Sequence, residues 1–358
     1  MDSAKVRIRH TARDDAIDWL RGIAILTMVE ANTAGLLLAN PHPLLLRALG
    51  SIAAPLFFSL AAMMVVLSHR QKGRTLRHFV LRGAAIIAVG ATLDMILWGQ
   101  LPFQTFDVLY PLGLSMPLAL VALRMPTAAR WACLVTLVGS APILQHVVGY
   151  SAQPVALRLS QIAAFPGNIP VCVRQMLVDG WFPLCPWLGF TFLGVHLAVR
   201  RWPVPAAAPP APSATPNVPP VTRPPLLAMA MLAIGAACWL PESGSQYVRS
   251  GFSELFYPPT VAYFVAAGGA VIVLLYLGDL VGARGPWRPV RLLGQRSLLL
   301  YVLHLVIAAL ILRPLLGVVR LWGFCLLYAA MCAVLFATPY AISAISSRWR
   351  RAPASPAP

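Results

Sequence analysis

Long apolar runs, separated by charged residues, proline and glycine, recur along the whole chain. A bilayer core about 30 Å thick requires roughly 20 apolar residues of helix, and ten runs approach that length. They cover residues 18–40, 47–68, 78–98, 107–123, 130–148, 181–199, 226–241, 257–278, 297–318 and 320–346. The fourth and seventh runs are short. The pattern predicts an all-α fold, a polytopic transmembrane helix bundle with about ten spans.

Composition supports the same fold class. Of the 358 residues, 59% are hydrophobic and only 11% are charged, and the mean hydropathy is +0.74, which no ordinary soluble domain reaches. The first apolar run has the length of a span and contains Glu30, and no small-residue cleavage site follows it. We therefore expect this run to remain as a helix and not to be removed as a signal peptide.

The net charge of +17 is distributed unevenly between the predicted loops. If the N-terminus is cytoplasmic, 20 of the 28 Lys and Arg residues fall in cytoplasmic segments, two lie in spans (Arg21 and Arg82), and six are outside: Arg47, Arg158, Arg174, Arg249, Arg313 and Arg320. Positive charge concentrates on the cytoplasmic side of membrane proteins. The bias predicts cytoplasmic N- and C-termini and contacts with anionic lipid, and it leaves no need for a nucleic-acid partner.

Breaks in the apolar pattern predict five parts. They are a cytoplasmic basic N-terminus (1–17), a six-span part holding the proposed site (18–200), a Pro-rich cytoplasmic linker (201–225), a four-span part (226–346) and a basic disordered tail (347–358). Residues 149–180 form the longest outer loop, and their apolar content suggests a lid or pocket wall, although a connector without substrate contact fits the composition equally well.

The first run contains polar residues that a bilayer helix rarely accepts. Asn32 follows Arg21 by 11 residues, which at about 100° per residue leaves an offset of only about 20°, so the two share a helix face while Glu30 points elsewhere. Polar groups at such depth usually face a protein interior or a water-filled cavity. His42 follows at the outer end of the run. The alternatives are an Asn that only bonds a neighbouring helix and a solvated loop His.

The string "IDWLRGIAILTMVEANTAG" resembles the opening of the catalytic domain of heparan-alpha-glucosaminide N-acetyltransferase and its bacterial relatives, within the broader multi-span membrane acyltransferases. The residues that carry the resemblance are Asp18, Arg21, Gly22, Met28, Val29, Asn32 and Gly35, and His42 stands near the place of the family's catalytic His. Further similar strings are "FDVLYPLGLS", "WFPLCPWLGFTFLGVHLAV" and "LGQRSLLLYVLHL", so the likeness touches most of residues 14–310.

The chain departs from that family's pattern before the second span. An acidic residue is usual there, but "RALGSIAAPLFF" contains none, so any role of that acid cannot be carried over. Glu30 has no counterpart in the pattern and has no assigned role.

The resemblance implies a membrane-bound, acetyl-CoA-dependent acyltransferase of the bacterial inner membrane. It would move an acetyl group from cytoplasmic acetyl-CoA to a sugar amine or hydroxyl of an envelope carbohydrate or other small acceptor at the outer face. His42 would act as a general base or as an acetyl carrier, and Asn32 would stabilise charge on the thioester carbonyl. N- or O-acetylation, direct transfer or an acetyl-His intermediate, acyl chain length and oligomeric state stay open.

CoA phosphates require cations on the cytoplasmic side. The candidates are Arg21, Arg74, Arg77, Arg288 and Arg291, for which the alternative is a purely topological role against anionic lipid. His304 is expected to pack between helices, with a pocket role as the alternative. The six cysteines form no C-x-x-C pair and no ligand spacing with histidine, so no metal is expected.

Two other functions fit the same pattern. One is an O-acyltransferase of the broader ten-span acyltransferase group. The other is a small-molecule transporter or flippase, in which Arg21, Glu30 and Asn32 line a permeation path and no covalent step occurs. Consumption of labelled acetyl-CoA by the purified protein separates enzyme from transporter.

Overall fold

The structure is a computed structural model, which describes residues 14–151, 153–203, 225–243, 249 and 251–351. Most of the predicted N-terminal segment, most of the linker and the last tail residues lie outside this range. The helices of the first part are α1 (Asp15–Leu37), α2 (Leu44–Lys72), α3 (Leu76–Leu93), α4 (Leu109–Arg124), α5 (Thr127–Val148), α6 (Phe165–Arg174) and α7 (Leu184–Arg201). Those of the second part are α8 (Leu226–Ser243), α9 (Val261–Val281), α10 (Arg288–Gln295), α11 (Ser297–Val306), α12 (Arg313–Leu316) and α13 (Leu321–Arg351).

Short helical turns of other types extend these helices. Single π-helical segments follow α3 (Asp94–Trp98), α6 (Gln175–Asp179) and α11 (Ile307–Leu312), and 3₁₀ segments precede α6 (Leu159–Ala164) and α10 (Gly285–Trp287). The described residues contain no β-strand beyond isolated bridges. The predicted all-α fold class is confirmed.

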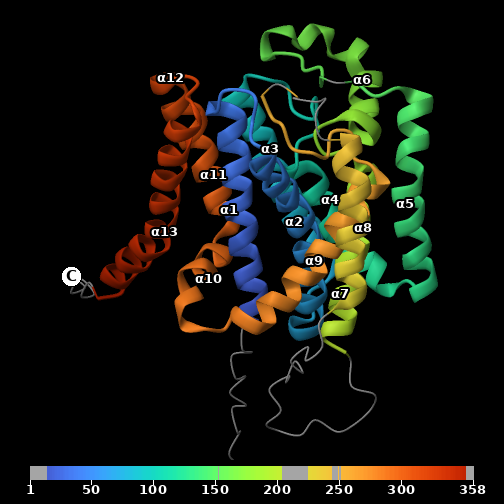
Figure 1. Ribbon diagram of the computed structural model, residues 1–358, viewed down its shortest axis with the longest axis vertical. Helices are drawn as coiled ribbons and strands as arrows, with labels where there is room; N and C mark the ends of the chain where they lie inside the picture. Colours follow the sequence, from blue (N-terminus) through green and yellow to red (C-terminus); the bar gives the residue numbers. More distant parts are fainter. Residues whose placement is uncertain (1–13, 152, 204–224, 244–248, 250, 352–358) are drawn as a thin grey trace, which may run out of the picture.

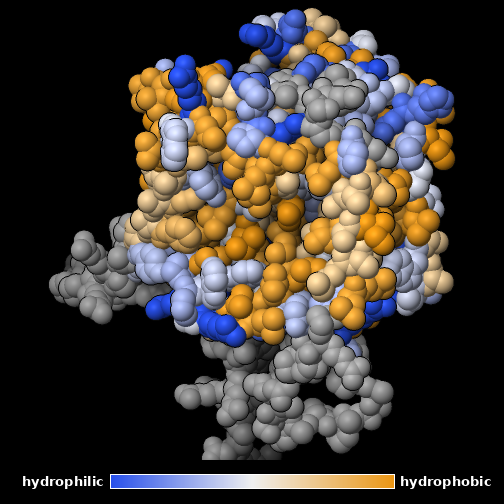
Figure 2. Space-filling model, in the orientation of Figure 1, coloured by the Kyte–Doolittle hydropathy of each residue, from blue (hydrophilic) through white to orange (hydrophobic). Residues whose placement is uncertain are grey.

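Seven helices in the described part of the chain are long and apolar enough to cross a membrane, or eight if the bent pair formed by 159–179 and 184–201 is one span. The two short predicted runs correspond to α4 and α8, which are apolar but too short to count among these spans. The structure therefore supports fewer full-length spans than the ten predicted runs. Figure 2 shows a broad apolar band across the middle of one face, with hydrophilic side chains gathered toward the two ends. That distribution is what a bilayer-spanning bundle requires.

Helices α1 and α2 form the centre of the bundle (Figure 1). Helix α2 packs against α1, α4, α7 and α9, and α1 also packs against α9, α10 and α11. Helices α5 and α13 lie at the periphery, where only 11% and 17% of their apolar windows are buried inside the protein. Their exposed apolar faces are suited to lipid.

The two ends of the bundle are named by one residue each, Arg201 and His42. At the Arg201 end, where α1 begins and α2, α7 and α9 finish, the Arg201 guanidinium bonds Asp14 Oδ2 at 2.8 Å and Asp279 Oδ1 at 2.6 Å. These buried ion pairs join α1, α7 and α9. At the His42 end, irregular loops and α6 cover the bundle (Figure 1).

Local sequence explains where the central helices begin and end. Asp14 caps α1 by accepting a hydrogen bond from Ile17 N at 3.2 Å, as N-cap aspartates commonly do. Helix α2 ends at Gly73, whose φ of 61° is the left-handed conformation that favours glycine. Helix α1 approaches α10 so closely that a β-carbon on Gly22 would lie 2.1 Å from Val290 O. This contact requires glycine.

Candidate active site

Two cavities adjoin inside the bundle. One, of about 260 Å³, lies toward the His42 end, and the other, of about 590 Å³, lies toward the Arg201 end. Four residues line both: Met28, Phe57, Val108 and Tyr301. The cavities therefore meet at a shared wall in the middle of the bundle, between α1, α2, α4 and α11.

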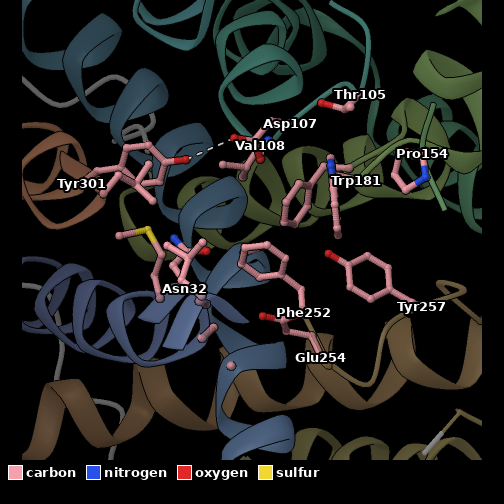
Figure 3. Close-up of a pocket in the computed structure, with 18 of the residues that line it drawn as sticks. Asn32, Thr105, Asp107, Val108, Pro154, Trp181, Phe252, Glu254, Tyr257 and Tyr301 are labelled. Atoms are coloured by element: carbon pink, nitrogen blue, oxygen red, sulfur yellow. Dashed lines mark hydrogen bonds between the residues drawn. The ribbon is translucent and has the colours of Figure 1, made fainter. Parts of the chain in front are cut away.

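The cavity toward the His42 end is called the acidic cavity, because three carboxyl groups line it and the described residues of its lining include no Arg, Lys or His. These acids are Asp94, Asp107 and Glu254. Six aromatic residues, called the aromatic wall, also line it: Trp98, Trp181, Phe182, Phe252, Phe256 and Tyr257. In Figure 3, Asn32, Asp107 and Tyr301 lie on one side of the space, and Trp181, Phe252, Glu254 and Tyr257 lie on the other. Two residues of the long 149–180 loop, Pro154 and Ala156, also line it.

The cavity toward the Arg201 end is called the basic cavity, because its lining contains Arg21, Lys72, Arg82 and Arg296 and no acidic residue. Arg21 Nη2 donates to Ser297 Oγ at 2.7 Å, which joins α1 to the start of α11. Arg21 also approaches Asp18, with 3.8 Å between Nη1 and Oδ1. The two cavities thus carry opposite charge on the two sides of their shared wall.

Asn32 lines the acidic cavity and is fixed by α11. Its Nδ2 lies 3.1 Å from Nε2 of His304, a fully buried residue. The other ring nitrogen, Nδ1, lies 3.2 Å from the Leu300 carbonyl oxygen, which can only accept. In the neutral ring, Nδ1 therefore donates to Leu300 and Nε2 accepts from Asn32. This pairing orients the Asn32 carboxamide and leaves its second amide hydrogen for another acceptor.

His42 lies in the loop between α1 and α2 and is buried, with 8% of its surface exposed. Its Nε2 lies 3.0 Å from the Leu38 carbonyl oxygen, and its Nδ1 lies 2.5 Å from Ser253 Oγ. Because the carbonyl can only accept, Nε2 donates and Nδ1 accepts the Ser253 hydroxyl proton in the neutral ring. Burial lowers the pKa of His42, which keeps the ring neutral near pH 7. His42 does not line the acidic cavity itself, but both chain neighbours of Ser253, Phe252 and Glu254, do.

Arg249 joins three segments at the His42 end and holds part of the aromatic wall. Its fully buried guanidinium donates to Gly180 O at 2.9 Å, Asp179 O at 2.6 Å and Ser151 O at 3.2 Å. It also lies over the rings of Tyr150, Trp181 and Tyr257, at 4.9–5.2 Å from their centroids. Since Trp181 and Tyr257 line the acidic cavity, Arg249 supports that cavity from behind.

Two acids of the acidic cavity bond tyrosines. Tyr110 donates to Asp94 Oδ2, and Tyr301, which lines both cavities, donates to Asp107 Oδ2 at 3.4 Å (Figure 3). Asp94 opens the π-helical turn that follows α3, and such turns often occur at functional sites. Glu254 differs from these two acids, because one of its carboxylate oxygens is buried without a hydrogen-bond partner.

The structure separates the residues predicted to bind CoA. Arg21 lines the basic cavity, whereas Arg74, Arg77, Arg288 and Arg291 do not. Arg74, Arg77 and Arg288 are exposed, and Arg291 bonds the carbonyl oxygens of Gly282 and Arg284. The cavity's other cations are Lys72, Arg82 and Arg296.

Sequence reasoning overlooked most of the acidic cavity. Asp94 gave a signal, since it is an acid within an apolar run. Glu254, Trp181 and Tyr257 lie in irregular loops, where no periodicity marks a buried face. The pairing of Asn32 with His304 joins residues 272 positions apart, which no local pattern reveals. The described residues contain no group of three or more His, Cys, Asp or Glu that is arranged to hold a metal ion.

The fold and the cavities define the class: a polytopic all-α membrane protein with a charge-divided internal site. Residues 13–223, more than half of the chain, match the family heparan-alpha-glucosaminide N-acetyltransferase, catalytic. The chain therefore belongs to this family, and the resemblance seen in the sequence is confirmed. Membership identifies a membrane protein of the acetyltransferase type. A comparison with curated proteins finds no match. His304, Tyr301 and Glu254 lie outside the matched residues.

Proposed function

We propose that the protein transfers an acetyl group from cytoplasmic acetyl-CoA to a sugar amine or hydroxyl at the opposite face of the membrane. The observation that carries this proposal is the meeting of a basic and an acidic cavity at a shared wall. CoA brings several phosphates and a long, thin thioester arm. The basic cavity suits the phosphates, and the shared wall is where the thioester would reach the acceptor.

The charge pattern supports the direction of transfer. The basic cavity lies at the Arg201 end, which carries most of the Lys and Arg residues and which we assign to the cytoplasmic side. Arg21, Arg82 and Arg296 would contact phosphate oxygens, with Lys72 as an additional point charge. The acidic cavity has the reverse character, because it would repel phosphates and suits an acceptor with a cationic or hydroxyl-rich surface. Its aromatic wall suits the apolar face of a sugar ring.

Asn32 is proposed to stabilise the transition state. When a nucleophile attacks the thioester, negative charge develops on the carbonyl oxygen, and a prepositioned amide hydrogen stabilises that charge. The bond to His304 already uses one hydrogen of the Asn32 amide and fixes its plane. The second hydrogen would then point to the carbonyl oxygen without further reorganisation.

His42 is proposed as the base or the acetyl carrier. Both of its ring nitrogens contact protein atoms, so either role requires the ring to release Ser253 or Leu38, or to act through the Ser253 hydroxyl. The lowered pKa is compatible with both roles, since a neutral imidazole can accept a proton and can also attack a thioester. The acceptor would be an envelope carbohydrate in a bacterial inner membrane.

The test uses the purified full chain in liposomes with acetyl-labelled CoA and a panel of amino sugars and neutral sugars. We expect labelled acetyl-CoA to be consumed only when an acceptor is present, with the label recovered on that acceptor. His42→Ala should reduce kcat by about 10²- to 10⁴-fold and Asn32→Ala by about 10²- to 10³-fold. Both variants should still bind CoA.

The rival function is a transporter, which the adjoining cavities also permit. In that case, the liposomes would accumulate a sugar without losing acetyl-CoA, and His42→Ala would leave that uptake intact. This outcome would overturn the transferase proposal.

A further inference from the structure

Two glutamates meet beside the acidic cavity. Glu30, in α1, and Glu254, in the loop before α9, are both buried, with 4% and 7% of their surfaces exposed. A β-carbon on Gly50 of α2 would lie 3.4 Å from Glu254 Cγ and 3.5 Å from Glu30 Oε2, so both side chains border the same small space. Each has one carboxylate oxygen buried without a hydrogen-bond partner. Of the two, only Glu254 lines the cavity (Figure 3).

Burying these two carboxyl groups in the ionised form costs free energy, and a proton on one of them reduces that cost. A buried carboxylate without a hydrogen bond loses its hydration, and two carboxylates that border the same small space repel each other. The charged and titratable groups that face the pair are Arg47 from α2, Tyr263 from α9, Tyr328 from α13 and Tyr257 from the loop of Glu254. Only Arg47 among them is a cation. One cation facing two carboxyl groups favours a pair that carries a single proton.

The position of the pair relates it to the proposed chemistry. Glu254 follows Ser253, whose hydroxyl contacts His42 and whose carbonyl accepts from Arg47 Nε at 2.6 Å. Asn32 lies two residues beyond Glu30 and lines the same cavity as Glu254. An acceptor bound in that cavity would therefore have a carboxyl group with an unpaired oxygen beside it, and the proposed carbonyl stabiliser in the opposite wall.

We propose, on the basis of the proposed function with His42 as the acetyl carrier, that Glu30 and Glu254 form a carboxylic acid pair with one shared proton, and that Glu254 takes the proton from the acceptor during acetyl transfer. In the first step, a nitrogen of the neutral His42 ring attacks the thioester carbon, the carbon–sulfur bond breaks with its electron pair leaving on sulfur, and the ring proton passes to sulfur to give the CoA thiol. In the second step, the acceptor nitrogen or oxygen forms a bond to the acetyl carbon as its proton passes to Glu254. The bond between the acetyl carbon and the His42 nitrogen breaks, its electron pair stays on that nitrogen, and the proton then passes from Glu254 to His42.

In this assignment, Glu254 is a catalytic residue and Glu30 is a positioning residue that acts through Glu254. Burial raises the pKa of Glu254 to about 7. In a pair that carries one proton, Glu30 holds that proton while Glu254 is ionised, so the shared proton stabilises the Glu254 carboxylate and repulsion opposes only the second ionisation. Glu30 thereby keeps Glu254 ionised and able to accept a proton near pH 7, where a general base is most effective.

The test compares pH profiles of kcat/KM for the wild type, Glu30→Gln, Glu30→Asp and Glu254→Gln, at saturating acetyl-CoA. The matched control is Asp15→Asn, which removes a partly buried carboxylate at the start of the same helix, where Asp15 Oδ1 lies 3.7 Å from Arg291 Nε. Glu254→Gln should lower kcat/KM by about 10²-fold or more and remove the rising limb of the profile. Glu30→Gln should move that limb to higher pH, because the Glu254 carboxylate loses the proton that Glu30 shares with it, and Glu30→Asp should move it less. Asp15→Asn should match the wild type.

A second measurement does not depend on activity. The infrared carbonyl band of protonated carboxyl groups should titrate near neutral pH in the wild type and in Asp15→Asn, and at higher pH in Glu30→Gln. A rising limb and an infrared titration that both stay unchanged in Glu30→Gln would overturn the pair, even if the enzyme transfers acetyl groups. A wild type without transferase activity would instead refute the proposed function, while the infrared titration would still decide whether the pair shares a proton.

Discussion

Replacing Arg82 and Arg296 together with Gln tests whether the basic cavity holds the CoA phosphates. Hydrogen bonds to charged groups contribute about 1.5–3 kcal/mol each, and 1.4 kcal/mol corresponds to a tenfold change in an equilibrium constant. Both residues line the basic cavity, but Arg82 is exposed and Arg296 is only partly buried, so we take the low end of that range. The double variant should bind CoA about 100-fold more weakly, while the KM for the acceptor should change little.

The assay is direct binding of CoA and of dephospho-CoA, followed by initial rates at varied acetyl-CoA. If either arginine contacts the 3′-phosphate of CoA, its replacement should remove the protein's higher affinity for CoA than for dephospho-CoA. The matched control is the double variant of Arg74 and Arg77, which are exposed and do not line the cavity. Its effect should stay within a few-fold and should fade at high salt. Equal losses in the two double variants, or a loss only in the control, would refute the assignment of the donor to this cavity.

Four further predictions concern single features of the bundle. His304→Ala should lower kcat with little change in CoA binding, because the Asn32 carboxamide loses the acceptor that orients it; single-turnover rates measure this. Arg249→Lys should lower stability by about 3 kcal/mol, since lysine cannot reproduce its several buried hydrogen bonds; an unchanged thermal midpoint would contradict this. Burial raises the pKa of Glu254 from 4.5 in the unfolded chain to about 7 in the folded protein. The free energy of unfolding of the wild type should therefore fall by up to about 3 kcal/mol as the pH rises from 4.5 to about 7. Thermal unfolding of Glu254→Gln should show a flatter pH dependence. Reporter fusions at positions 44 and 165 should be external and a fusion at 203 cytoplasmic; an inverted pattern would reverse the proposed direction of transfer.

Helix existence and helix faces could be predicted because they depend on local physics. A run of about 20 apolar residues forms a helix in a bilayer whatever surrounds it, since its backbone groups must be paired within the segment. The offset between Arg21 and Asn32 follows from helix geometry alone. In the structure, Arg21 lines the basic cavity and Asn32 lines the adjoining acidic cavity. The family could be recognised for a similar reason, because its residues are concentrated in one continuous stretch.

The site itself depends on contacts between distant segments. Glu30 was an unexplained acid in the sequence, and only the packing of α1, α2 and the loop before α9 brings it beside Glu254. The cations of the basic cavity could not be distinguished from those that only set the topology, because an arginine at a helix end has the same local sequence in either role. Irregular loops have no periodicity to mark a buried face, so the acidic cavity and its aromatic wall were decided by tertiary packing alone.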